Sequence, residues 1–255
     1  MIIMPLGVGG AFTSRFYHNN YIFDLNGITL LLDAGTTLRD SLGASDIEVC
    51  DIDYVFITHF HFDHVGGLEE LLMKRYWRFV DNEHAPLKLN VIVHETQVNL
   101  YHMLLQPGLS NQGLTLNDYC EFIVLPESNS LHLNGYEISL TDISDLHVKG
   151  MKSFAVKILE TNSKKNILFT SDIKFLTNSN FIEQINENTC AIFQDISFTE
   201  NQAHSTLNEV LSYYPKRFHN KIYAMHYCDD IESYTYVIQQ ANINITIQGK
   251  PILIE

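Results

Sequence analysis

Short apolar runs recur along the chain and predict the strands of a sheet-rich protein. They occur at residues 2–6, 21–24, 28–33, 54–57, 89–93, 137–141, 153–159, 167–171 and 222–225. Runs of this length, bounded by polar or glycine residues, are typical of buried strands. Asn26-Gly27 separates two of them and is a dipeptide that favours a tight hairpin turn. Residues 21–24 and 28–33 are therefore expected to pair.

Two segments between these runs carry apolar residues at helical spacing. Those residues are Leu68, Leu71 and Leu72 in the first segment, and Ile231, Tyr234, Ile238 and Ala241 in the second. A final pair of short strands is expected around Gly249. No internal repeat, low-complexity segment or linker interrupts the pattern. We therefore expect an α/β fold that occupies residues 1–255 as one domain.

The charge of the chain narrows the range of partners. It has 16 Lys and Arg against 30 Asp and Glu in 255 residues, which gives a formal net charge of −14. Its basic residues come singly or in small groups such as Lys164-Lys165, whereas proteins that bind polyanions cluster them. We therefore expect a small-molecule substrate and no binding to long nucleic acid.

The sequence also indicates a compartment. No apolar run approaches the ~20 residues of a membrane span, so no membrane partner is expected. The four cysteines, at positions 50, 120, 190 and 228, share no short spacing, as is typical of free thiols in a reducing compartment. Residues 1–5 lack the basic region of a signal peptide. We expect a cytoplasmic protein.

One short segment, His59-Phe60-His61-Phe62-Asp63-His64, holds three histidines and an aspartate. It directly follows the strand predicted at 54–57 and precedes Gly66-Gly67, where the chain can turn tightly before a helix. On a loop at a strand end, His59 and His61 can face one cation. Asp63 and His64 can then turn toward a second. Imidazole nitrogen and carboxylate oxygen are ligands that zinc accepts.

This segment resembles the metal-binding motif of the metallo-β-lactamase superfamily. The resemblance implies three more ligands after downstream strands, and His147, Asp172 and His226 stand there in the expected order. By this resemblance, one metal ion is held by His59, His61 and His147, the other by Asp63, His64 and His226, and Asp172 bridges them. It also implies that Asp33 braces the histidine loop. The implied fold is an αββα sandwich, in which two mixed sheets are flanked by helices.

A helix start near residue 204 supplies a candidate general acid. Thr206 and Glu209 form a Thr-x-x-Glu capping box. His204 lies just before this helix, where the dipole and free N–H groups favour an anion, and it is well placed to protonate a leaving alkoxide. We expect Ser205 and Thr206 to contact the substrate there. The alternative is that they only cap the helix and His204 is incidental.

The segment around His204 is similar to the corresponding motif of ribonuclease Z and its small phosphodiesterase relatives. Two metal ions about 3.5–4 Å apart can bind a phosphodiester and activate water together. Zinc is the expected metal, and manganese also suits the carboxylate contacts. His204 would protonate the departing sugar oxygen. Asp63 is counted as catalytic because, besides holding metal, it would orient the nucleophile.

Three functions are compatible with this site. The opening Leu6-Gly7-Val8-Gly9-Gly10-Ala11-Phe12-Thr13 resembles the phage-encoded anti-Pycsar enzymes and their bacterial relatives. This implies hydrolysis of cyclic CMP, cyclic UMP and similar cyclic mononucleotides to nucleoside monophosphates, against antiphage signalling, in a bacterial or phage-infected cell. A tRNA 3′-processing endonuclease of the ribonuclease Z type is a second function, but residues 148–171 leave no room for its basic arm. A nucleotide sponge without turnover is the third.

One further segment bears on assembly. Residues 106–119 hold Pro107, two glycines and several polar residues, which predicts a long loop. In the anti-Pycsar relatives, a partner's loop reaches toward the neighbouring site. A homodimer is therefore expected.

Overall fold

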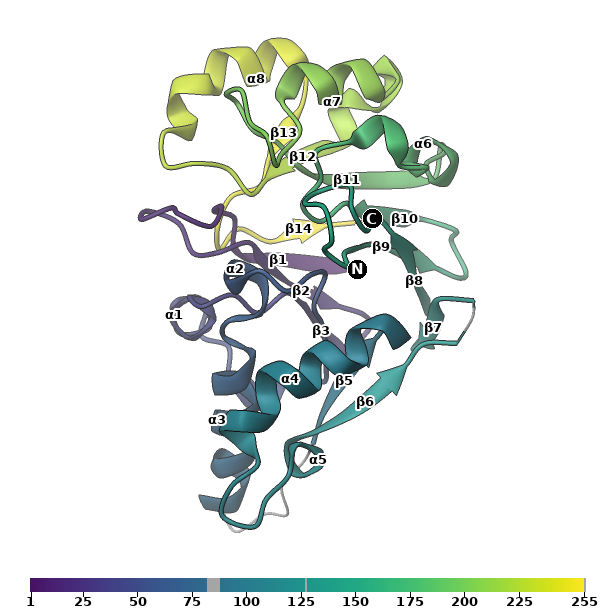
Figure 1. The fold of residues 1–255 in the computed structure, drawn as a ribbon. Coiled ribbons are helices and arrows are strands. Elements are labelled where there is room, and N and C mark those ends of the chain that lie inside the picture. Colours follow the sequence, from purple (N-terminus) through teal and green to yellow (C-terminus); the bar gives the residue numbers. More distant parts are fainter. Residues whose placement is uncertain (82–87, 127, 255) are drawn as a thin grey trace.

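Two sheets packed face to face form the centre of the protein (Figure 1). The computed structural model describes residues 1–81, 88–126 and 128–254. Over these residues each sheet has seven strands, in the orders β14-β1-β2-β3-β4-β5-β6 and β13-β12-β11-β10-β9-β8-β7. The strands of the first sheet are β1 (Ile2–Gly7), β2 (Asn20–Asp24), β3 (Thr29–Leu32), β4 (Tyr54–Phe56), β5 (Leu89–Val93), β6 (Cys120–Val124) and β14 (Ile252–Leu253). Those of the second are β7 (Ser130–Leu133), β8 (Tyr136–Asp142), β9 (Phe154–Glu160), β10 (Asn166–Phe169), β11 (Thr189–Asp195), β12 (Ile222–Met225) and β13 (Asn244–Ile245).

Helices cover the outer faces of both sheets (Figure 1). Those beside the first sheet are α1 (Leu38–Ala44), α2 (Phe62–Val65), α3 (Leu68–Asp81), α4 (Val98–Leu109) and α5 (Leu116–Tyr119). Those beside the second are α6 (Phe181–Gln184), α7 (Leu207–Tyr213) and α8 (Thr235–Ala241). In the described part of the chain, no helix is long and apolar enough to cross a membrane.

Alternation along the strands explains this layering. In β2, Tyr21 and Phe23 face the core between the sheets, where the Tyr21 ring lies 5.2 Å from that of Phe169 in β10. Ile22 and Leu31 point the other way, into the core beneath the helices. A period of two places successive side chains on opposite faces. Strands buried on both faces are therefore apolar throughout, as the sequence pattern predicted.

The expected hairpin is present. Strands β2 and β3 pair antiparallel, with Tyr21 opposite Leu32. Asn26 and Gly27 connect them at φ values of 56° and 88°. Two successive residues with positive φ are what a type I′ turn requires, and Asn-Gly is the pair that adopts them at least cost.

The segment 106–119 was wrongly predicted to be a loop. Helix α4 runs to Leu109 with Pro107 inside it, and α5 follows from Leu116. Leu105 and Leu109 are fully buried one helical turn apart. Their burial favours helix, whereas Pro107 lies in the last turn and removes only one backbone donor. Only residues 110–115 connect the two helices.

The parallel strand pairs bring most of the expected metal ligands to the same edge of the sheets. Strands β3 and β4 are parallel neighbours in the first sheet, and β10, β11 and β12 are parallel neighbours in the second. Parallel strands end at the same edge of a sheet, so the residues that follow them meet there. All the expected metal ligands except His147, which follows β8, come after β4, β10 or β12.

Candidate metal centre and adjoining pocket

The first group of ligand atoms comes from the expected residues. His59 and His61 follow β4, and His147 follows β8. His61 Nδ1 lies 3.1 Å from His59 Nε2 and 3.3 Å from His147 Nε2. Asp172 Oδ2 lies 3.8 Å from the Nε2 atoms of both His59 and His147. The four atoms surround one point.

The second group shares Asp172. Its Oδ2 atom lies 3.4 Å from His64 Nε2 and 3.3 Å from His226 Nε2. Asp63 Oδ2 completes the group at 3.3 Å from His64 Nε2 and 3.2 Å from His226 Nε2. One carboxylate oxygen thus belongs to both groups, which is the bridging position that the resemblance implied for Asp172.

The geometry of both groups fits metal ions. Tetrahedral ligands at ~2.0–2.2 Å from zinc are about 3.3–3.6 Å apart, close to the shorter separations in both groups. Asp63 Oδ1, Asp172 Oδ1 and His64 Nε2 are buried polar atoms without a hydrogen-bond partner. Buried polar atoms are rarely left in this state. Of the three, His64 Nε2 belongs to the second group, where a cation would satisfy it directly.

Outer contacts orient these ligands. Asp33 Oδ2 lies 2.8 Å from His64 Nδ1, and the same carboxylate accepts hydrogen bonds from the backbone N–H and the hydroxyl of Thr58. His147 Nδ1 lies 2.8 Å from the carbonyl oxygen of Ala203. Such partners fix the tautomer and leave Nε2 free for a metal. Asp33 braces the histidine loop as expected.

Protonation states also favour a cation. Burial lowers the pKa of His59 well below its usual value, so the ring is neutral and can act as a ligand. Burial alone would raise the pKa of Asp63, but the hydrogen bond from His226 and the nearby His64 ring outweigh it and lower the pKa. Around His64, the carboxylates of Asp172 and Asp33 overcome the effect of burial and raise the pKa of the ring. The site therefore attracts positive charge, which a metal ion would supply in place of a proton.

His204 stands beside the second group and contacts a residue that the sequence did not reveal. Its Nδ1 atom lies 2.7 Å from Asp195 Oδ2. Burial alone would lower the pKa of His204, but the Asp195 carboxylate outweighs it and raises the pKa to about 9. Asp195 is fully buried at the end of β11. Asp195 therefore favours the protonated form of His204 next to the candidate ligand cluster.

Ser205 and Thr206 have structural partners instead of facing the pocket. The Ser205 hydroxyl is buried and donates to the carbonyl oxygens of Ile173 and Lys174. Thr206 is the N-cap of α7, and its hydroxyl accepts from the Glu209 N–H in the predicted capping box. Helix α7 has only seven residues. This geometry does not support the expected substrate contacts of these two hydroxyls.

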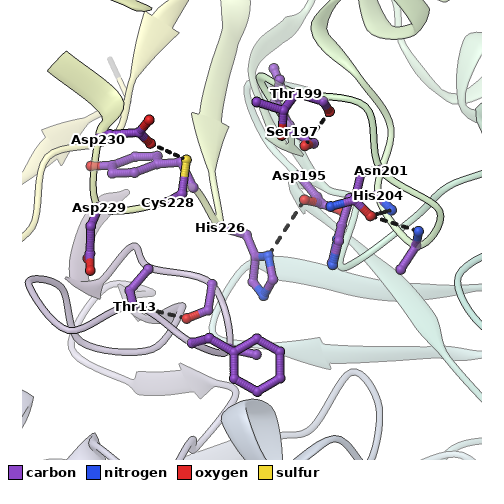
Figure 2. A pocket seen from close by; sticks show the side chains of 16 residues that line it. Thr13, Asp195, Ser197, Thr199, Asn201, His204, His226, Cys228, Asp229 and Asp230 are labelled. Carbon is purple, nitrogen blue, oxygen red and sulfur yellow. Dashed lines mark hydrogen bonds and ion pairs between the residues drawn. The ribbon is translucent and has the colours of Figure 1, made fainter. Parts of the chain in front are cut away.

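A pocket of about 600 Å³ opens beside His204 and His226. Figure 2 shows Asp195, Asn201 and His204 on one side, Cys228, Asp229 and Asp230 on the other, and His226 between them. Its lining residues are Gly10, Ala11, Phe12, Thr13, Asp195, Ile196, Ser197, Thr199, Asn201, Ala203, His204, His226, Tyr227, Cys228, Asp229 and Asp230. A substrate in this pocket would reach both the ligand cluster and the acid.

Comparison with known proteins identifies the family. The family model described as anti-Pycsar protein Apyc1 matches residues 1–252. The chain belongs to the Apyc1 family. It is 33% identical to the anti-Pycsar protein Apyc1 of Paenibacillus sp. (strain J14), over 91% of each chain. It is 29% identical to that of Bacillus phage BSP38, over 99% of this chain and 98% of the phage protein.

Solved structures place the Apyc1 family chain in a known fold. The metallo-β-lactamase fold protein YhfI from Bacillus subtilis is similar with a TM-score of 0.75 and 15% identity, over 98% of both chains. Human tRNase Z, short form, gives a TM-score of 0.71 and 15% identity over the whole of both chains. At this identity the likeness shows the fold alone. The expected αββα metallo-β-lactamase sandwich is confirmed.

Backbone strain gathers at the same strand ends in this Apyc1 family member. Asp33, Ser171 and His226 have φ values of 63°, 59° and 58°. Residues other than glycine seldom adopt this left-handed region, which costs of order 1–3 kcal/mol at each position. Each of the three is a candidate ligand, precedes one or braces one. The strain turns the chain sharply after the strand so that the side chains converge.

Proposed function

We propose that this protein is a metal-dependent phosphodiesterase that hydrolyses 3′,5′-cyclic mononucleotides, such as cyclic CMP and cyclic UMP, to nucleoside monophosphates. The observation that carries the proposal is the shared Asp172 Oδ2 atom with His204 beside it at one pocket. The anti-Pycsar name of the relatives supports a role against cyclic-nucleotide antiphage signalling in the bacterial cytosol.

The residues divide the work of the reaction. Two ions, with zinc the first candidate, would be held by the two ligand groups and would bind the phosphodiester and activate water. Asp63 orients the attacking water besides holding metal. His204 gives its proton to the departing ribose oxygen, a poor leaving group that otherwise departs as an alkoxide. Asp195 holds the ring of His204 and keeps it charged.

The pocket supports a small substrate. Its volume of about 600 Å³ is within the range of small-molecule sites, ~300–1,000 Å³. Asp229 and Asp230 line it and add to the net charge of −14, which repels polyanions. The interval between His147 and Asp172 is filled mainly by the antiparallel strands β9 and β10. It has no basic arm, and this disfavours the alternative of a tRNA 3′-endonuclease.

A substrate panel tests the proposal. Purified protein is incubated with 3′,5′-cyclic nucleotides of each base and with a pre-tRNA, with and without chelator. We expect chelator-sensitive release of nucleoside monophosphates and no cleavage of the pre-tRNA. Efficient tRNA processing at physiological salt would favour the endonuclease instead. Product that stops at one equivalent per chain would favour the nucleotide sponge.

A homodimer stays a prediction, and less of the chain now supports it because most of the expected loop is helical. Residues 110–115 are the only part of the expected loop that is not helical. Met103 and Leu104 of α4 lie nearby in sequence and are exposed apolar residues, which a subunit contact would cover. Light scattering at micromolar concentration should give twice the chain mass. A monomer with full activity would contradict the dimer.

A further inference from the structure

An exposed aromatic ring stands at the rim of the pocket. Phe12 is 90% exposed and lines the pocket. Tyr227 also lines it but is buried, and its hydroxyl donates to the carbonyl oxygen of Thr246. A single exposed phenylalanine on a surface needs no explanation. The loop that carries Phe12, however, is joined to the segment after His226 by several hydrogen bonds.

The loop of Phe12 is held by a carboxylate from the segment that follows His226. Asp229 accepts hydrogen bonds from the backbone N–H groups of Ser14, at 2.9 Å, and Arg15, at 3.0 Å. The Arg15 guanidinium also donates to the backbone oxygen of Asp229 and forms a two-point ion pair with Glu232. The Thr13 hydroxyl closes the turn by donating to the carbonyl oxygen of Gly10. The position of Phe12 is therefore set by the segment that follows His226.

The same loop lies directly against a metal ligand. The Gly10 N–H donates to the carbonyl oxygen of Tyr227, 3.1 Å away. A Cβ atom added at Gly10 would lie 3.3 Å from the ring of His226, a contact that would press on the ring. Gly10 thus allows the backbone to approach the ligand closely. This approach fixes the distance between Phe12 and the ligand cluster.

We propose that Phe12 is the stacking platform for the base of the nucleotide substrate, an inference that rests on the proposed function. The phosphate of a cyclic nucleotide must lie at the ligand cluster, so its base, at the far side of the ribose, extends into the pocket. Among the aromatic side chains that line the pocket in the described residues, Phe12 offers an open face. Every base has a π-face, so stacking tolerates any of them. The enzyme should accordingly accept both pyrimidine and purine cyclic nucleotides.

The test compares substrates with and without a base. Steady-state kinetics are measured for the metal-loaded wild type, Phe12→Ala and Phe12→Trp on cyclic CMP, cyclic AMP and the 3′,5′-cyclic phosphate of a ribose without base. Tyr236→Ala, which removes an aromatic ring 72% exposed on α8, is the matched control. Light scattering of each variant records whether the subunit mass changes.

The expected pattern is a defect that depends on the base. Phe12→Ala should raise KM for both nucleotides about 5- to 150-fold, the range of aromatic–base stacking. It should leave kcat nearly unchanged, because the base is stacked equally in the ground and transition states. Phe12→Trp should retain wild-type KM, and Tyr236→Ala should match the wild type throughout. The base-free substrate should show far less loss in Phe12→Ala than the nucleotides show.

Two results would overturn the inference alone. One is an equal loss on the base-free substrate and the nucleotides. The other is an unchanged KM, with or without an altered subunit mass, which would assign Phe12 to a subunit contact or to no role. A wild type that cleaves bis-p-nitrophenyl phosphate but no cyclic nucleotide would instead reject the proposed function, and with it this inference. Since the wild type is measured first, the two failures are distinguishable.

Discussion

The ligand cluster and the pocket beside it are built in different ways. The ligands follow β4, β8, β10 and β12, and most are almost fully buried. The pocket is walled by segments 10–13, 195–204 and 226–230, which carry exposed residues such as Phe12. Sheet topology fixes the ligand cluster, whereas contacts between loops fix the pocket. In the proposed enzyme, reaction chemistry would therefore depend on the sheets, and substrate choice would depend on the loops.

The largest expected effect comes from removing the ligand that both groups share. Asp172→Ala should reduce the metal content from about two ions per chain by at least one, because its Oδ2 atom belongs to both groups. Turnover should fall by more than the ~10–100-fold that follows loss of an outer contact, and the free energy of unfolding should fall with it. Elemental analysis and thermal unfolding measure both. A well-folded wild type that holds less than one ion after reconstitution would refute the two-ion site.

The next effect separates proton delivery from metal binding. His204→Ala should keep both ions, because no ligand is lost, while turnover of a cyclic nucleotide falls by roughly 10²–10⁴. A ribose oxygen needs the proton to depart, whereas p-nitrophenolate hardly needs it. Activity on bis-p-nitrophenyl phosphate should therefore be largely kept. Equal losses on the two substrates would mean that His204 positions the phosphate instead of donating a proton.

A smaller effect tests the contact between Asp195 and His204 through pH. His204 must be protonated to act, and its pKa is raised to about 9 because Asp195 outweighs the effect of burial. Activity on cyclic nucleotides is then present at neutral pH and lost as pH rises through that value. In Asp195→Asn the negative charge is gone, so this loss should move to lower pH. Profiles of kcat from about pH 6 to 10 record the shift, and an unmoved basic limb would contradict the role of Asp195.

Asp195 also shows where prediction from the sequence ended. It follows the apolar residues Ile192 and Phe193 in the same way that Asp172 follows its own strand. A single carboxylate at a strand end has no motif around it, so the sequence gives no reason to select it. Its role depends on β11 lying between β10 and β12, which places three strand ends side by side. Such adjacency of strands is a property of the folded sheet.

The candidate ligands could be selected from the sequence for the opposite reason. Four of the seven lie within the segment 59–64, and the order of His147, Asp172 and His226 along the chain matches a known pattern. The sandwich fold followed from the same resemblance. The helix at Gln106–Leu109 was missed because Pro107 and Gly108 are typical of loops, whereas burial of Leu109 favours the helix. Local composition predicted the hairpin at Asn26-Gly27 correctly, but it predicted a loop at Gln106–Leu109, where the structure has a helix.

The smallest effect decides what Thr206 does. In the structure it caps α7, so Thr206→Ala should lower the free energy of unfolding by about 1 kcal/mol, the usual cost of losing an N-cap. For a chain of this size, that is a fall in Tm of about 2–4 °C. Thr206→Ser keeps a capping hydroxyl and should behave as the wild type. If Thr206 only caps, KM for a cyclic nucleotide stays unchanged in Thr206→Ala. If its hydroxyl binds substrate as the sequence suggested, KM rises in this variant even at temperatures far below Tm. Loop residues would then contribute to substrate binding on the His204 side as well as at Phe12.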